Sequence, residues 1–205
     1  MIPQRFVTEY PQRCRQLLDL LEPEARRTDL VGSFSLLVAS AAFTIPFGRM
    51  TEPKHPLGRP EPGLSSAIKT LARAPFLAAP FWNGQTPAFF RYARIVNDPE
   101  FAGGWKDEVG AHPIASAAEK DGNTVLRTIR HALAHGNVVY LDENGHESPG
   151  NRVRYLAFLA KHDDGNSFRV TIFGEEDFLM FLKAWIAWVQ TFPPESAFDF
   201  LEAAE

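Results

Sequence analysis

The sequence predicts an α+β fold that is mainly helical, with a small β-hairpin or sheet between the last two helices. Three observations predict it. Apolar residues recur at helical spacing, most regularly in Glu175–Phe192. Two β-rich runs, Val153–Lys161 and Ser167–Phe173, flank His-Asp-Asp-Gly-Asn, a strong hairpin signal. The length of 205 residues suits a single domain, 1–205, with its own hydrophobic core.

Two helices are expected at the start of the chain. Phe6–Leu21 carries a broad leucine stripe, and Pro23 ends that helix or begins the next segment. Asp29–Phe43 is apolar around most of its circumference, so we expect it to be buried, either in a bundle or in a dimer interface. Leu64–Ala74 is a third, shorter candidate helix.

Residues 46–105 are predicted to form an irregular insertion rich in proline and aromatic residues. Five prolines and three glycines in Pro46–Gly63 argue against any regular helix. Pro75–Trp105 is expected to be irregular as well, and to cover the active face or mediate assembly. Its run Phe89-Phe90-Arg91-Tyr92 combines stacking groups with a cation, which suits single-stranded RNA, although packing is the commoner role of such residues.

The next helix is expected at Asn123–His135. Asp121 or Asn123 is a suitable N-cap, and Gly136-Asn137 is a good C-terminal stop. Val138–Asp142 then forms a short strand, which leads into the predicted hairpin.

Charge and cysteine content exclude several classes of protein. The net charge is −4, and residues 175–205 hold seven acidic residues and one lysine, which leaves 20 basic and 18 acidic residues elsewhere. A local basic site fits this balance, whereas a broad basic surface does not. The single cysteine, Cys14, excludes an internal disulfide and a cysteine-based zinc site. With no signal-peptide pattern and an apolar run, Leu36–Ile45, too short to cross a bilayer, we expect a cytoplasmic protein with no membrane partner.

One face of Asn123–His135 gathers the residues that could carry chemistry. At 100° per residue, Arg127, Arg130, His131 and His135 fall on one side of the helix, opposite an apolar side. An imidazole can exchange a proton with a hydroxyl, and a guanidinium can hold a phosphate bidentately, so the pair suits phosphodiester cleavage. The ordinary alternative is a solvated face of an amphipathic helix.

The segment Leu126–Asn137 resembles the motif of HEPN domains. That motif has an arginine, a polar residue directly after it, and a histidine after four to six intervening residues. Arg130, His131 and His135 match in that order, with four residues between the arginine and the histidine. The continuation Ala-His-Gly-Asn is similar to a plasmid- and phage-associated branch of the family, in which strands and a closing aromatic helix follow the motif helix. The resemblance extends over about residues 120–190.

The resemblance implies a HEPN-like helical bundle and a homodimer whose two motif helices form a composite site. It also implies a metal-independent endoribonuclease, with no cofactor, that leaves a 2′,3′-cyclic phosphate by attack of the 2′-hydroxyl. Arg130 would bind the scissile phosphate, His135 would be the general acid/base, and His131 would support the site geometry. Many members are toxins or defence effectors, which implies an RNA substrate and an antitoxin partner. Other members only bind, so the alternative is a non-catalytic module for a nucleotide or a protein.

Four further residues are candidates for substrate binding: Arg127, Asn137, Arg152 and Arg154. Arg152 and Arg154 flank the predicted hairpin, where they either extend a phosphate-binding surface or form a polar strand face. His131 and His135 also have the spacing of metal ligands on a helix. Because Ala132 stands where zinc hydrolases place a glutamate, and no third ligand is tied to the pair, no metal is expected.

Overall fold

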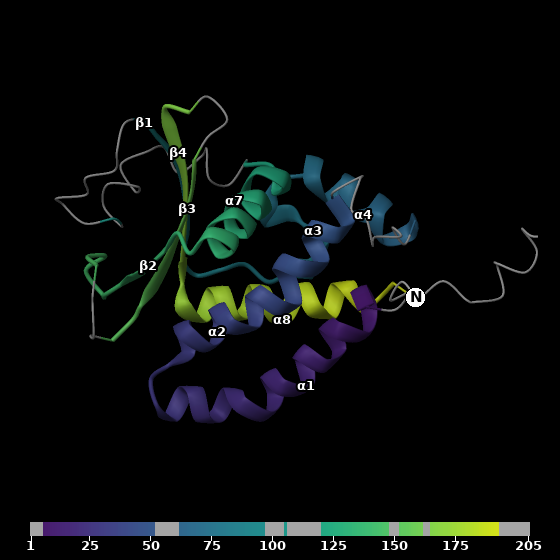
Figure 1. Cartoon of the computed structure of the whole chain (residues 1–205), viewed down its shortest axis with the longest axis horizontal. Helices are drawn as coiled ribbons and strands as arrows, with labels where there is room; N and C mark the ends of the chain where they lie inside the picture. The colour runs from purple at the N-terminus through teal and green to yellow at the C-terminus, as the bar shows by residue number, and fades with distance from the viewer. Residues whose placement is uncertain are drawn as a thin grey trace, which may run out of the picture.

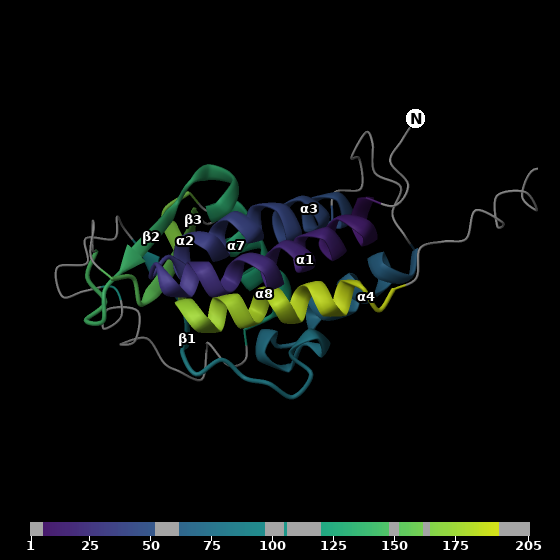
Figure 2. The same cartoon turned by 90° about the horizontal axis from the view of Figure 1, so that it is seen from below.

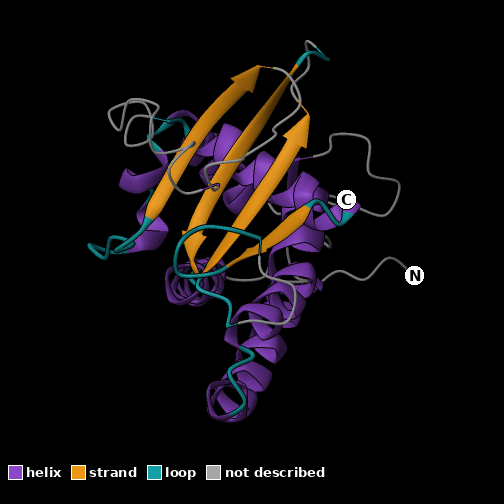
Figure 3. Cartoon of the chain, turned by 90° about the vertical axis from the view of Figure 1, so that its left-hand side faces the viewer, coloured by secondary structure: helices purple, strands orange, loops and turns teal. Residues whose placement is uncertain are grey.

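A layer of helices packs against one face of an antiparallel sheet (Figures 1 and 3). The fold is therefore α+β, as the sequence predicts. The computed structural model describes residues 6–51, 62–96, 105, 120–147, 152–161 and 165–192. The last four acidic residues of the chain, from Glu195 onward, lie outside the described residues.

The helical layer is built around the C-terminal helix α8. The helices are α1 (Phe6–Arg27), α2 (Val31–Ala39), α3 (Ile45–Thr51), α4 (Pro62–Arg73), α7 (Gly122–His135) and α8 (Glu175–Val189). Helices α1, α2 and α8 lie side by side, and α7 packs on the sheet next to them, against α4 and the π-helical turn Ser40–Thr44 (Figures 1 and 2). Short 3-10 turns at Phe76–Ala78 and Pro80–Trp82 follow α4.

Helix α1 continues past the proline at which we expected it to end. Pro23 lies inside α1, and the helix reaches Arg27. The last turns are held by ion pairs with α8: Arg26 contacts Glu176 through two hydrogen bonds of 2.6 and 2.8 Å, and Lys183 lies 2.6 Å from Glu22. Helix α1 thus stays helical through Pro23 where it packs against α8.

The expectation that Pro46 begins an irregular loop is also wrong for its first residues. Helix α2 continues through a π-helical turn, Ser40–Thr44, directly into α3, which contains Pro46. A proline has no N–H for the carbonyl four residues earlier, which here belongs to Ala42. The indole Nε1 of Trp185 donates to that carbonyl, at 3.2 Å. A side chain from α8 therefore satisfies a backbone group that Pro46 cannot satisfy.

The resulting long helix is relevant to whether the chain could cross a membrane. Val31–Gly48 is long and apolar enough to cross a bilayer by length and composition, and 56% of it is buried inside the protein. It packs against α1 and α8. The core helix of a soluble protein can have the same length and apolar composition, and the burial of Val31–Gly48 matches a core helix.

The sheet contains one strand that we did not expect. In the described residues the strand order is β1-β4-β3-β2, and all three pairings are antiparallel. The strands are β1 (Phe90–Val96), β2 (Val138–Leu141), β3 (Tyr155–Lys161) and β4 (Ser167–Gly174). The β3–β4 hairpin is the predicted one. Strand β1 falls within Pro75–Trp105, which we expected to be irregular, and it precedes α7, so the sheet is not confined to the segment between the last two helices.

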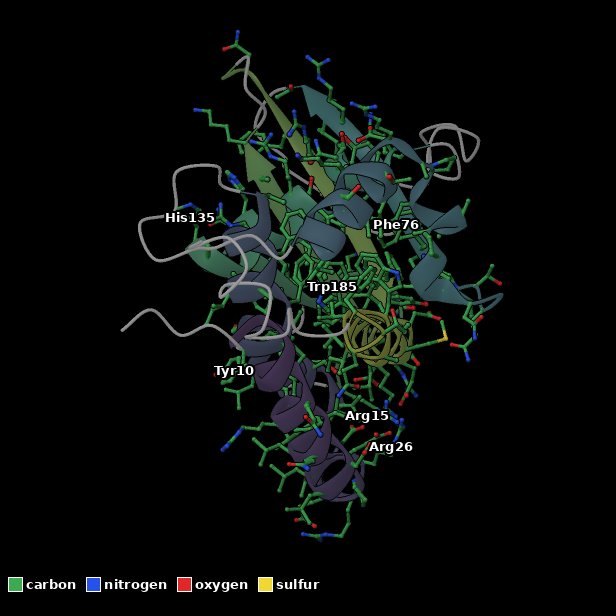
Figure 4. All side chains as sticks on the ribbon, turned by 90° about the vertical axis from the view of Figure 1, so that its right-hand side faces the viewer. Tyr10, Arg15, Arg26, Phe76, His135 and Trp185 are labelled. Carbon is green, nitrogen blue, oxygen red and sulfur yellow. The ribbon has the colours of Figure 1, made fainter. Side chains whose placement is uncertain are left out.

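Aromatic side chains fill the space between the sheet and α8. Phe76, Phe81 and Trp82 are buried, as are Phe90 and Tyr92 of β1, so these residues contribute to the core. Phe181 of α8 lies at the centre of the cluster, with ring centroids 5.6 Å from Phe43 and 5.9 Å from Phe76. Figure 4 shows Phe76 and Trp185 in the interior of the molecule.

Asp177 in the first turn of α8 fixes the start of β1. Its carboxylate accepts hydrogen bonds from the backbone N–H groups of Ala88 (2.7 Å) and Phe89 (2.9 Å), and the side chain is buried. We expect Asp177→Ala to lower the free energy of unfolding by about 1.5–3 kcal/mol, because two part-buried hydrogen bonds to a charged group are lost and the two N–H groups lose their acceptor. Urea denaturation measures the change. The exposed neighbour Glu176 provides the control: Glu176→Ala loses a surface ion pair with Arg26 and should cost less than about 1 kcal/mol.

Candidate functional site on helix α7

Helix α7 begins and ends where local sequence dictates. The Asp121 carboxylate accepts a hydrogen bond from the Thr124 N–H at 2.8 Å, as an N-cap does. At the other end Gly136 has φ +71°, and the amides of Gly136 and Asn137 both reach the carbonyl of Ala132. This is a glycine-terminated C-cap, and it makes His135 the last residue of the helix.

The two sides of α7 differ as the helical wheel predicts. Val125, Leu126, Ile129 and Ala132 are fully buried against the core. On the opposite side Arg127 and His135 are exposed, while Arg130 and His131 are half-buried. The imidazole rings of His131 and His135 have centroids 5.9 Å apart. Figure 4 shows His135 at the molecular surface, away from the aromatic core.

Arg130 is positioned by a contact with another helix. A Cβ atom added to Gly48 of α3 would lie 3.3 Å from Nη2 and 3.6 Å from Nε of Arg130. The guanidinium therefore lies directly on the backbone of α3, and Nε is buried there. Because Gly48 has no side chain, the guanidinium can rest against α3 and extend along it. No sequence pattern predicts this contact, since residues 46–63 were expected to be irregular.

The electrostatic surroundings of His131 are cationic. Burial is the largest effect, and it lowers the pKa of the His131 imidazole below its ordinary value. Positive charges lower this pKa further, in the order Arg130, Arg127, His135 and Arg169. His131 is therefore neutral near pH 7, with a lone pair available to accept a hydrogen bond or a proton.

One arginine of the sheet joins this region, and we did not identify it from the sequence. Arg169 of β4 acts on His131, and its register partner across the sheet is Arg94 of β1. The Nε of Arg94 donates to the Ser167 hydroxyl at 3.0 Å. Alternation along β4 puts Arg169 on the same face as Phe173, which is the face that α7 covers. The sequence signal that could have identified Arg169 is a charged residue at an inward-facing position of a β-rich run.

Arg152 and Arg154 lie elsewhere. Arg152 pairs with Asp29 at 3.0 Å, and Arg154 lies 3.7 Å from Glu175 at the start of α8. The Asn137 carbonyl accepts from the amide of Leu159, five residues along the chain from Arg154 and thus roughly 16 Å along the strand. The structure therefore does not bring Arg152 and Arg154 together with the motif residues.

Asn137 lies close to the motif residues along the chain. Asn137 is exposed between α7 and β2, two residues after His135. Among the described residues, no group of three or more His, Cys, Asp or Glu side chains could hold a metal ion.

Comparison with protein-family models, with curated proteins and with solved structures gives no match to this chain.

Proposed function

We propose that the protein is a metal-independent endoribonuclease of HEPN type. The observation that carries the proposal is the imidazole pair at the exposed end of α7, next to a guanidinium that α3 positions. The resemblance of Leu126–Asn137 to the HEPN motif connects Arg130, His131 and His135 with RNA cleavage. A cytoplasmic location, an antitoxin partner and a toxin or defence role belong to the same proposal.

Cleavage needs two proton transfers and a stabilised phosphate. The 2′-oxygen of the ribose forms a bond to phosphorus while the bond from phosphorus to the 5′-oxygen breaks, which yields a 2′,3′-cyclic phosphate and a 5′-hydroxyl. One group must accept the 2′-hydroxyl proton, and another must donate a proton to the leaving oxygen. His135 is exposed and serves as general acid/base, and neutral His131 beside it can share the two transfers.

Arg130 supplies the charge that the reaction requires. Negative charge builds up on the phosphate oxygens in the transition state, and a guanidinium can hold two of them at once. The nearby charges of Arg127 and Arg169 attract the RNA backbone to the same face of the protein. The net charge of −4 then confines RNA binding to this face, which suits a site-specific nuclease better than a coat protein.

The proposal includes a homodimer in which two α7 helices face one another. The exposed end of α7 leaves His135 accessible to a second copy of the chain. Sedimentation velocity tests this part: a stable monomer across the concentrations at which RNA is cleaved would exclude the composite site.

The function is tested with labelled RNA in the presence of EDTA. We expect cleavage by the wild type that EDTA does not affect, and products ending in 2′,3′-cyclic phosphate. RNA carrying a 2′-deoxy sugar at the cut site should resist, because the attacking hydroxyl is missing. Cleavage of that substrate at an undiminished rate would rule out the mechanism. RNA that binds to the α7 face and stays intact under all conditions would instead favour the non-catalytic binding module.

Gly48→Ala tests the positioning of Arg130. The added methyl group would meet the guanidinium at 3.3 Å, so Arg130 must move. A contact this tight requires a shift of a few tenths of an ångström. We expect RNA cleavage to fall by up to about tenfold, since a displacement of about 1 Å at a reacting group can cost about 10²-fold. The matched control is Gly63→Ala on α4, where a Cβ atom meets nothing within 4 Å. Equal cleavage by the two variants would separate Arg130 from the reaction.

His131 should also make the free energy of unfolding depend on pH. Its pKa in the folded protein is lower than in the unfolded chain, where it is about 6.5. As pH falls below that value, the unfolded chain takes up the proton first, so the free energy of unfolding should decrease. His131→Gln should make the decrease smaller in urea titrations between about pH 7 and pH 5. A decrease of equal size in the wild type and in His131→Gln would contradict the prediction.

A further inference from the structure

A hollow of about 410 Å³ opens beside the C-terminal end of α7. Gly136 and Asn137 form part of its wall, so it begins one residue after His135. The remaining wall comes from the start of β2, the end of β3 and the start of β4, which includes Lys161 and Phe168. The volume falls within the range of small-molecule sites in proteins.

The floor of the hollow is apolar and partly aromatic. Val139, Leu159 and Phe168 pack in the cluster on the face of the sheet opposite α7, where each is half-buried. Phe168 pairs with Lys161 across the β3–β4 hairpin, so the ring and the ammonium-bearing side chain stand at the same end of the sheet. A half-buried phenyl ring offers a flat surface on which another flat ring can stack.

The rim of the hollow is polar and carries side chains whose hydrogen-bonding groups are open to a ligand. Asn137 and Lys161 are both exposed. Within the described part of the chain, neither side chain makes a hydrogen bond or an ion pair. The amide of Asn137 offers both donor and acceptor groups, and the ammonium of Lys161 offers donors alone. A flat apolar ligand with hydrogen-bonding groups along its edge would satisfy both the floor and the rim.

We propose that this hollow binds the nucleobase next to the scissile phosphate, and that it directs the nuclease to unpaired RNA. The identification of the occupant rests on the proposed function of the α7 face. The two residues that follow His135, Gly136 and Asn137, both line the hollow, so a phosphate held at His135 places its attached nucleoside next to the hollow. Bases in single-stranded loops can be splayed out and stacked on an aromatic ring, whereas bases in a duplex cannot. Phe168 stacks on the base, and Asn137 and Lys161 contact its edge.

The test measures binding and cleavage separately. Calorimetry with each of the four ribonucleoside 3′-monophosphates measures affinity for the base, and inorganic phosphate serves as the reference for a ligand without a base. Phe168→Leu keeps an apolar side chain but removes the stacking ring. We expect this variant to bind the preferred nucleotide about tenfold more weakly and to bind phosphate as the wild type does. Asn137→Ala should change which nucleotide is preferred.

The control variant is Phe89→Leu, a half-buried ring on the same face near Tyr155, at the far end of the sheet. Wild-type nucleotide affinities and an unchanged profile of cleavage sites in both Phe168→Leu and Asn137→Ala would overturn the base site, even if His135→Ala abolishes cleavage. Conversely, nucleotide binding that is lost in Phe168→Leu and kept in Phe89→Leu would establish the base site, even if no RNA is cleaved. Equal cleavage of paired and unpaired RNA by the wild type would contradict the preference for unpaired substrate.

Discussion

Replacing His135 with alanine is expected to lower RNA cleavage by about 10²–10⁴-fold, which is the usual contribution of a general acid/base. The side chain is exposed at the end of α7 and makes no core contact, so the variant should fold normally. Cleavage of labelled RNA under single-turnover conditions measures the effect. Arg130→Ala should reduce cleavage by about 10²–10³-fold, because it removes stabilisation of charge in the transition state.

Two matched variants make this result specific. His146 is an exposed histidine on the turn after β2, and His146→Ala should cleave as the wild type does. Arg152 pairs with Asp29 away from α7, so Arg152→Ala should also keep full activity. If His135→Ala and His146→Ala cleave RNA equally well, the α7 face is not the active site. If Arg152→Ala loses as much activity as Arg130→Ala, the substrate extends much further along the sheet than we propose.

Trp185→Ala is expected to cost about 3–5 kcal/mol of unfolding free energy, as truncations of large buried aromatic residues do. Trp185 is fully buried and packs edge-on against Phe43, with centroids 5.1 Å apart. Its indole also donates to the Ala42 carbonyl. Urea denaturation followed by far-UV circular dichroism measures the change. A loss below about 1 kcal/mol would mean that α2 and α3 do not depend on this contact.

A double-mutant cycle separates the hydrogen bond from the packing. Trp185→Phe keeps a ring and removes the N–H, which should cost about 1–3 kcal/mol because the Ala42 carbonyl loses its donor. Pro46→Ala restores a backbone N–H four residues after Ala42. We expect the double variant to be more stable than the sum of the two single effects implies. Strict additivity would show that the indole does not replace the missing amide.

Local sequence determined the elements whose ends are set by short-range chemistry. The cap at Asp121, the left-handed Gly136 and the two faces of α7 are all readable from residues within one or two turns of each other. The same is true of the β3–β4 hairpin, which the alternation and the turn residues specify. The candidate chemistry of Arg130, His131 and His135 was visible for the same reason, since it lies on one helix face.

Tertiary contacts decided the elements that local sequence argues against. Helix α3 includes Pro46 where Trp185, remote in sequence, supplies a donor to the nearby Ala42 carbonyl, and β1 forms where β4 offers it a hydrogen-bonding edge. Pairs so distant in sequence leave no local pattern, so Pro46–Gly63 and Pro75–Trp105 looked irregular.

Tertiary contacts also decided the surroundings of the site. The sequence by itself determined which residues share the exposed face of α7, because helical periodicity is a local property. Only the folded chain decided that Gly48 positions Arg130, that Arg169 adds charge near His131, and that Arg152 and Arg154 are engaged elsewhere. The physical reason is that contacts between residues far apart in sequence depend on how the helices and strands pack, and packing is fixed by the whole core at once.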